Sequence, residues 1–194
     1  MYREEYEQWE RAVSRIVQTE RDAPVPGRYS RRAERIKVLH AAMDAGHKQF
    51  AQITKTTKRK PKFFTDTDEW KSLAVEFRLL HDVQREHAYL AGWPIWQERQ
   101  HTHCLTVDGE LRTAEVKAFD LDRQTIDVRH WVEGDFCGYL GMPNSTSREE
   151  TITLQQIIDG IQRHEENKRE RVAEAQERKR EAEREALPLF AAQI

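Results

Sequence analysis

A run of cations and aromatic residues, Lys55-Thr-Thr-Lys-Arg-Lys-Pro-Lys-Phe-Phe64, is the part of the sequence best suited to contact a polyanion. Lysine and arginine neutralise phosphates, and an aromatic ring can stack on an unpaired base. An alternative is a solvated basic loop with both phenylalanines packed in the core. We expect nucleic-acid contacts from this run and from cations upstream of it, namely Arg28, Arg31, Arg32, Arg35, Lys55, Lys58, Arg59, Lys60, Lys62, Phe63 and Phe64.

Positive charge is concentrated in this part of the chain. The whole sequence holds 32 basic and 34 acidic residues, for a formal charge of −2. Residues 28–62 hold 11 basic and 2 acidic residues, whereas the stretches before and after them have an excess of acids. This asymmetry is typical of a protein that binds a polyanion through one surface.

A second set of residues, Asp108, Glu115 and Lys117, has the types that metal-dependent phosphodiester cleavage uses. The set resembles the carboxylate-carboxylate-lysine pattern of nucleases of the PD-(D/E)xK type, which implies a divalent cation and cleavage of nucleic acid. A tight turn at Asp108-Gly109 leaves Asp108 about five strand residues, roughly 16 Å, from Glu115. Oxygen ligands lie within about 2.5 Å of a shared ion. We therefore expect a protein that is not an enzyme, with the nuclease as a weaker alternative.

Five residues have side chains that zinc prefers: His101, His103, Cys104, His130 and Cys137. Their spacing contains no compact Cys-x-x-Cys pair of the kind that structural zinc sites use. No glycine-rich phosphate loop, nucleophile elbow or His-Glu-x-x-His motif is present either. We expect no metal and no cofactor.

The C-terminal residues Ala186-Leu187-Pro188-Leu189-Phe190 combine three large apolar side chains with a charged stretch before them. They resemble the short peptide, typically Gln-Leu-Ser/Asp-Leu-Phe, by which bacterial replication and repair proteins dock on the DNA sliding clamp. Leu187, Leu189 and Phe190 match the apolar positions, and Ala186 stands in place of the glutamine. The resemblance implies that Ala186, Leu187, Leu189 and Phe190 bind a partner. The alternative is a tail that folds back on its own domain or mediates self-association.

Helical spacing predicts the elements that position the basic run. Apolar residues recur every three or four positions from Tyr2 to Ile16 and again from Ile36 to Ile53, with Asp22–Gly27 as the break between them. Gly46 either permits a close approach or divides the second helix. Thr65 or Thr67 caps a third helix whose buried side includes His87. We expect a three-helix unit over residues 1–95, with a basic loop at 54–64.

Residues 99–146 change to an alternating pattern. The stretches 103–107, 111–119 and 123–132 alternate apolar and polar residues, and 135–140 is expected to form a fourth short strand. Short strands joined by tight turns predict a small antiparallel meander or SH3-like barrel.

Residues 147–187 are expected to form one long charged helix. Thr153 with Gln156, or Ser147 with Glu150, supplies a capping box, and the apolar seam fades after Ile161. Pro188 is expected to end the helix, which leaves 188–194 as a tail.

The predicted fold class is therefore α+β: three helices, a small antiparallel sheet and a long C-terminal helix. We expect a cytoplasmic, non-enzymatic accessory or inhibitor of DNA replication or repair, of the kind that phages and plasmids encode. Its expected partners are DNA or RNA, the sliding clamp, and a second copy of the chain bound through the C-terminal helix. No run of about 20 apolar residues suggests a membrane span. The alternative is a protein–protein adaptor, such as a phage-type inhibitor of a host protein, that acts through the sheet and the long helix.

Overall fold

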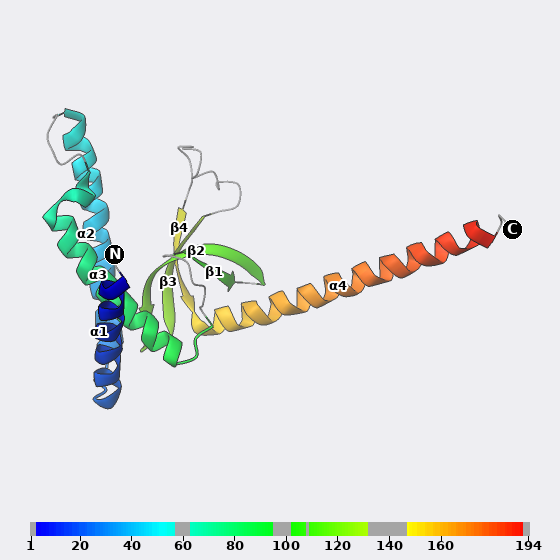
Figure 1. Ribbon diagram of the computed structural model, residues 1–194, viewed down its shortest axis with the longest axis horizontal. Helices are drawn as coiled ribbons and strands as arrows, with labels where there is room; N and C mark the ends of the chain where they lie inside the picture. The colour runs from blue at the N-terminus through cyan, green and yellow to red at the C-terminus, as the bar shows by residue number, and fades with distance from the viewer. Residues whose placement is uncertain (1–2, 57–62, 95–101, 108, 132–146, 192–194) are drawn as a thin grey trace. The chain divides into compact units, whose positions relative to one another are not determined.

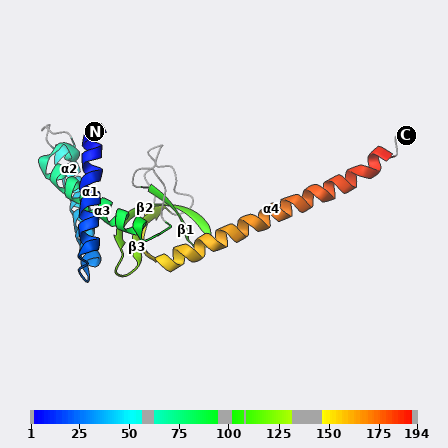
Figure 2. The ribbon, with the colours of Figure 1, turned by 60° about the horizontal axis from the view of Figure 1, so that its bottom comes forward.

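The computed structural model describes residues 3–56, 63–94, 102–107, 109–131 and 147–191. Figures 1 and 2 show helices and a small sheet, so the α+β prediction is confirmed. The elements are α1 (Arg3–Asp22), α2 (Arg28–Thr56), the short 3-10 helix η1 (Phe64–Asp66), α3 (Asp68–Leu90), β1 (Thr102–Val107), β2 (Glu110–Asp120), β3 (Thr125–Trp131), β4 (Ser147–Thr153) and α4 (Leu154–Ala191).

The chain divides into two compact units. One comprises Met1–Cys104 with Thr113–Leu154, and the other Leu105–Arg112 with Gln155–Ile194. This division differs from the predicted boundary between a helical unit and a β-domain, because α1–α3 share a unit with most of the sheet. The reason is apolar packing: Ala33 and Ile36 of α2 are buried in one cluster with Ala118 of β2.

Apolar residues at helical spacing hold α1 against α3. Val13 and Val17 of α1 pack with Val83 of α3, and Trp9 and Leu79 cover this cluster. The start of α3 is fixed by Thr67, whose hydroxyl accepts a hydrogen bond from the Trp70 amide at 3.1 Å. Thr67 is therefore the cap, one of the two residues that the sequence suggested.

The strands form one sheet in the sequential order β1-β2-β3-β4, which is the order of a meander. β3 pairs antiparallel with β2 and with β4, and a register shift between Val116 and Ala118 marks a bulge in β2. The first three predicted strands are confirmed within a few residues, while the predicted strand at 135–140 lies outside the described residues. SH3-like closure stays a prediction.

The stretch 147–153 is the main error in the predicted elements. It forms β4, in which Ile152 lies opposite Ile126 of β3, so Ser147 does not cap a helix. The Thr-Ile-Thr sequence suits a strand because β-branched side chains pack well on a pleated surface. α4 begins at Leu154 and continues to Ala191, so the break expected at Pro188 is also wrong.

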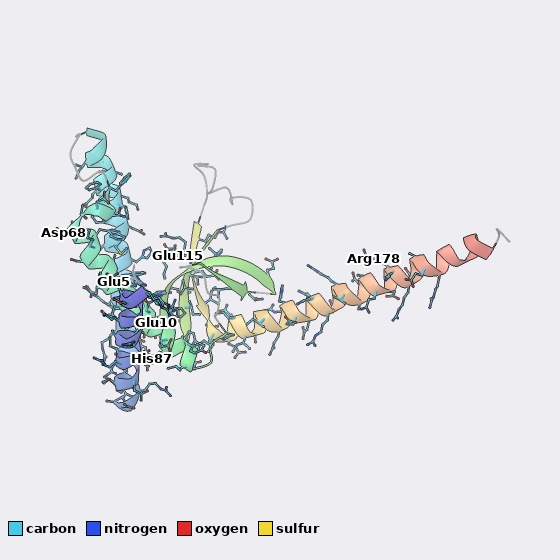
Figure 3. The ribbon with its side chains drawn as sticks, viewed as in Figure 1. Glu5, Glu10, Asp68, His87, Glu115 and Arg178 are labelled. Carbon is cyan, nitrogen blue, oxygen red and sulfur yellow. The ribbon has the colours of Figure 1, made fainter. Side chains whose placement is uncertain are left out.

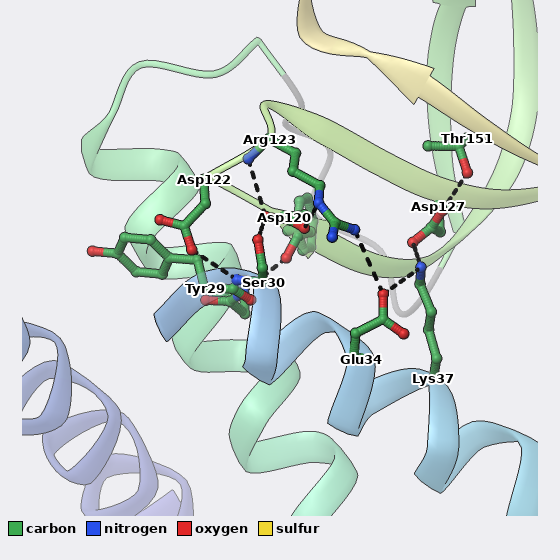
Figure 4. Close-up of polar contacts among 11 residues, drawn as sticks. Tyr29, Ser30, Glu34, Lys37, Asp120, Asp122, Arg123, Asp127 and Thr151 are labelled. Carbon is green, nitrogen blue, oxygen red and sulfur yellow. Dashed lines mark hydrogen bonds and ion pairs between the residues drawn. The ribbon is translucent and has the colours of Figure 1, made fainter. Parts of the chain in front are cut away.

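Polar contacts attach the turn between β2 and β3 to the start of α2 (Figure 4). Ser30 donates hydrogen bonds from its amide to Asp122 Oδ2 at 2.9 Å and from its hydroxyl to Asp120 Oδ1 at 2.8 Å. Further along α2, Lys37 Nζ lies 2.9 Å from Asp127 Oδ2, and the Thr151 hydroxyl donates to Asp127 at 2.6 Å. These contacts fix the orientation of α2 on the sheet.

Candidate nucleic-acid interface

The basic residues of α2 divide into two groups with different surroundings. Within residues 45–64 the sequence has no acid and these cations: Lys48, Lys55, Lys58, Arg59, Lys60 and Lys62. α2 is helical to Thr56, which places Lys48 on its exposed surface. The side chain of Lys55 and all of residues 57–62 lie outside the described part of the chain.

Two of the four arginines at the start of α2, Arg32 and Arg35, are committed to partners within the fold, whereas Arg31 is exposed. Arg32 pairs with Glu20 of α1 and donates to Gln84 of α3 at 3.3 Å, and its side chain is only 11% exposed. Arg35 donates two hydrogen bonds to Glu76, at 2.7 and 2.8 Å, which raise its pKa and lower that of Glu76. The Arg32 side chain is thus mostly covered and engaged with Glu20 and Gln84, which leaves little of it to contact nucleic acid. The Arg35 side chain is half exposed, but its charge is paired with that of Glu76.

Phe64 is an anchor and not a contact residue. It is 5% exposed, and its ring lies against the backbone of α2 at Gly46, where an added Cβ would come within 2.2 Å of the ring. His47 and Phe50 flank it with ring centroids 5.2 and 6.1 Å away. The expectation that Phe64 stacks on a base is therefore wrong. Gly46 serves a close approach and does not break the helix.

Phe63 has the opposite environment. It is 65% exposed and has an extended backbone (φ −125, ψ 147) directly before η1. Successive side chains of an extended chain point in opposite directions. Because Phe64 turns toward α2, Phe63 is turned toward solvent. The two residues, which the sequence treats alike, thus have different environments.

A polar groove lies between α2 and the sheet, in the same unit, and encloses a cavity of about 420 Å³. Its walls include Lys37, His40, Asp44, Lys117, Asp127, Glu149 and Thr151. Arg129 lies at the centre of its ion pairs, 2.9 Å from Glu149 and 3.3 Å from Asp44. Hydrogen bonds from Lys117 and Arg129 lower the pKa of Glu149 to about 2. The cations of the groove are thus paired with its acids, which outnumber them because Glu150 also lines the groove.

Two residues of the predicted nuclease set belong to this network. Glu115, labelled in Figure 3, lies 3.6 Å from His40 Nε2 and 3.7 Å from Arg129, and the hydrogen bond from His40 is the main cause of its lowered pKa. Lys117 donates to Glu149. Asp108 lies outside the described residues. Glu115 and Lys117 are therefore each engaged in an ion pair that joins elements of the fold.

A buried polar network that the sequence did not reveal joins the three helices. His87, 4% exposed, bonds Glu20 through Nε2 at 2.9 Å and Tyr29 through Nδ1 at 3.3 Å. Gln84, fully buried, donates to the carbonyls of Tyr29 and Phe119 at 2.9 and 2.8 Å. The only signal of this network in the sequence was the place of His87 on the buried side of its helix. That place predicted a core histidine with satisfied hydrogen bonds, and the prediction is confirmed.

The remaining candidates fall mostly outside the described side chains. Of the zinc-type residues, His130 is described: it is 7% exposed, with Nδ1 3.7 Å from Glu150. Across the described residues, no group of three or more His, Cys, Asp or Glu side chains is placed to hold a metal ion. None of the described helices is long and apolar enough to cross a membrane. Ala186, Leu187, Leu189 and Phe190 belong to the backbone of α4, and their side chains are not described.

Comparisons of the sequence with protein-family models and with curated proteins, and of the chain with solved structures, gave no match.

Proposed function

We propose that the protein is a non-enzymatic nucleic-acid-binding protein that uses the C-terminal end of α2 and the basic segment leading to Phe63. The observation that supports this most directly is the separation of its cations. Arg32, Arg35 and Lys37 form ion pairs within the fold, whereas residues 45–64 contain six cations and no acid. Cations with no acid among their neighbours in the sequence are the ones best suited to bind phosphates.

The proposal is tested by removing this charge. Replacing Lys55, Lys58, Arg59, Lys60 and Lys62 together by Ala should weaken binding to all sequences alike and flatten its salt dependence, since each lost phosphate contact reduces the slope by about one. Five exposed cations of α4 provide a matched control with the same loss of charge: Lys168, Arg169, Arg171, Lys179 and Arg180. Binding that survives the first change, or that falls equally with the control, contradicts the proposal.

A second role, as an accessory or inhibitor in DNA replication or repair, is supported by α4. Side chains from Glu165 to Arg184 are exposed along this helix, and ion pairs such as Arg178–Glu174 at 3.4 Å support it in water. The apolar terminal residues then have a charged helix as a spacer before them. We propose that Leu187, Leu189 and Phe190 bind a partner's apolar pocket, of which the bacterial sliding clamp is the leading candidate.

The same helix is a poor dimerisation surface. At four-three spacing its seam carries Glu165, Lys168, Val172, Ala175 and Lys179, all exposed. A parallel dimer in register would place each of the three charges opposite its own copy, which is unfavourable. A spacer is therefore the better proposal for α4.

The clamp interaction has a direct test. Replacing Leu189 and Phe190 by Ala should reduce affinity for the clamp at least about tenfold, since each buried side chain contributes roughly 1.5 to 3 kcal/mol, while the melting temperature stays the same. A peptide of residues 183–194 should bind by itself. A lower melting temperature together with no peptide binding would instead indicate a tail packed on its own protein. Retained binding to a host protein without nucleic acid would favour the adaptor alternative.

A further inference from the structure

We propose that the ligand at the end of α2 is single-stranded nucleic acid and that Phe63 provides the ring on which one of its bases stacks. This inference rests on the proposed function, to which it adds the class of nucleic acid and a specific contact residue. Phe63 is 65% exposed and immediately follows the basic segment in the sequence.

The backbone at Phe63 and directly after it is held by hydrogen bonds. The Phe63 carbonyl accepts from the Asp66 amide at 3.1 Å. The Phe64 carbonyl accepts from the amide and from the hydroxyl of Thr67, at 3.0 and 2.6 Å. Because Thr67 also caps α3, the start of that helix and the position of Phe63 are fixed together.

Apolar packing adds a second restraint. The Phe64 ring lies on the backbone of α2 at Gly46, between His47 and Phe50. This anchor holds the backbone next to Phe63 against α2, while the Phe63 ring itself stays exposed. A ring that is exposed on a fixed backbone loses little conformational entropy on binding. Phe63 is therefore arranged as a platform for a flat ligand.

Single strands are favoured over duplexes for a geometric reason. The faces of duplex bases are already stacked on their neighbours, so an exposed ring gains access only to an unpaired base. Phosphates of either form can contact the cations of residues 45–64, which gives charge complementarity without selectivity. Selectivity for the single strand therefore has to come from Phe63.

The test compares one sequence in two forms, measured by fluorescence anisotropy with the full chain. A labelled oligothymidylate of about 12 nucleotides should bind more tightly than the matching duplex. Phe63→Ala should weaken single-strand binding by about tenfold and leave duplex binding unchanged, and Phe63→Trp should restore it. Tyr89→Ala is the matched control, since Tyr89 is 56% exposed at the other end of α3.

The outcomes separate this inference from the proposed function. If the unmodified chain binds neither form at low salt, both fail. Equal binding of the two forms, unaffected by Phe63→Ala, overturns the stacking role and leaves the basic surface intact. Competition by polyglutamate as strong as that by the oligonucleotide would show a general polyanion surface and also overturn the inference. Circular dichroism of Phe63→Ala should match the unmodified chain, because the exposed ring contributes little to the core.

Discussion

The Asp122 carboxylate accepts a hydrogen bond from the backbone amide of Ser30 at 2.9 Å, although the two residues are 92 positions apart. Amides in the first turn of a helix have no partner within the helix and carry partial positive charge. α2 has no acidic residue in its own first turn. The turn between β2 and β3 thus supplies the carboxylate that the start of α2 lacks.

Removing this carboxylate should therefore destabilise the fold. We expect Asp122→Ala to lower the free energy of unfolding by about 1 kcal/mol, the usual cost of losing a helix cap. Asp122→Asn keeps an oxygen acceptor and should recover most of that loss. Urea denaturation measures both. Equal stability of all three proteins would show that the contact contributes nothing.

The contact of Gly46 with Phe64 predicts that Gly46→Ala lowers the stability of the protein, whereas helix propensity alone predicts that it raises the stability. Gly→Ala within a helix ordinarily stabilises by up to about 1 kcal/mol. At position 46 the new methyl group would lie 2.2 to 2.9 Å from three atoms of the Phe64 ring. We expect Gly46→Ala to destabilise by about 1–3 kcal/mol, as overpacking does.

A second variant separates the two effects. In a Phe64→Ala background the ring is gone, so Gly46→Ala should become neutral or stabilising. Thermal unfolding of the four proteins gives the coupling between the two sites. Additive effects would mean that the ring and the helix backbone do not meet.

Another glycine is expected to be equally intolerant in the second unit. A Cβ at Gly160 of α4 would lie 2.2 Å from the carbonyl oxygen of Thr106 in β1. Backbone atoms cannot move aside as a side-chain tip can, so Gly160→Ala should separate α4 from β1. Hydrogen exchange at β1 should then accelerate, whereas Ala175→Gly, on the exposed part of the same helix, should leave β1 protected.

Acid should weaken the fold through the Glu20–His87 pair, whose partners are Arg32 and Tyr29 of α2. Burial lowers the pKa of His87 and outweighs the opposing effect of Glu20. The unfolded histidine therefore binds a proton more readily, and stability falls as the pH drops below about 6.5. Burial alone would raise the pKa of Glu20, but hydrogen bonds from Arg32 and His87 lower it, so a further loss follows below about 4.5.

The pH dependence can be assigned by mutation. His87→Gln should lower stability at pH near 7.5, because a buried network loses a member, and should flatten the decline between about pH 7 and 5.5. His164→Gln, on α4, is the control and should keep the slope of the unmodified protein. An unchanged slope in His87→Gln would place the titrating group elsewhere.

The sequence by itself predicted the features that depend on near neighbours. The spacing of Val13 and Ile16, the cap at Thr67 and the alternation through Ile126 and Val128 each reflect a local periodicity, and the helices and first three strands follow from them. The concentration of cations between residues 28 and 62 is likewise a property of the chain alone.

Tertiary structure decided which of those residues remain available for binding. Arg32 finds Glu20 and Gln84 on other helices and is mostly covered, and Phe64 finds Gly46 and is buried, while Phe63 stays exposed. β4 forms because β3 offers Ile126 opposite Ile152, which overrides the capping pattern at Ser147. In each case the deciding partner is distant in sequence and close in space. Burial and ion pairing depend on that partner, and no local pattern contains it.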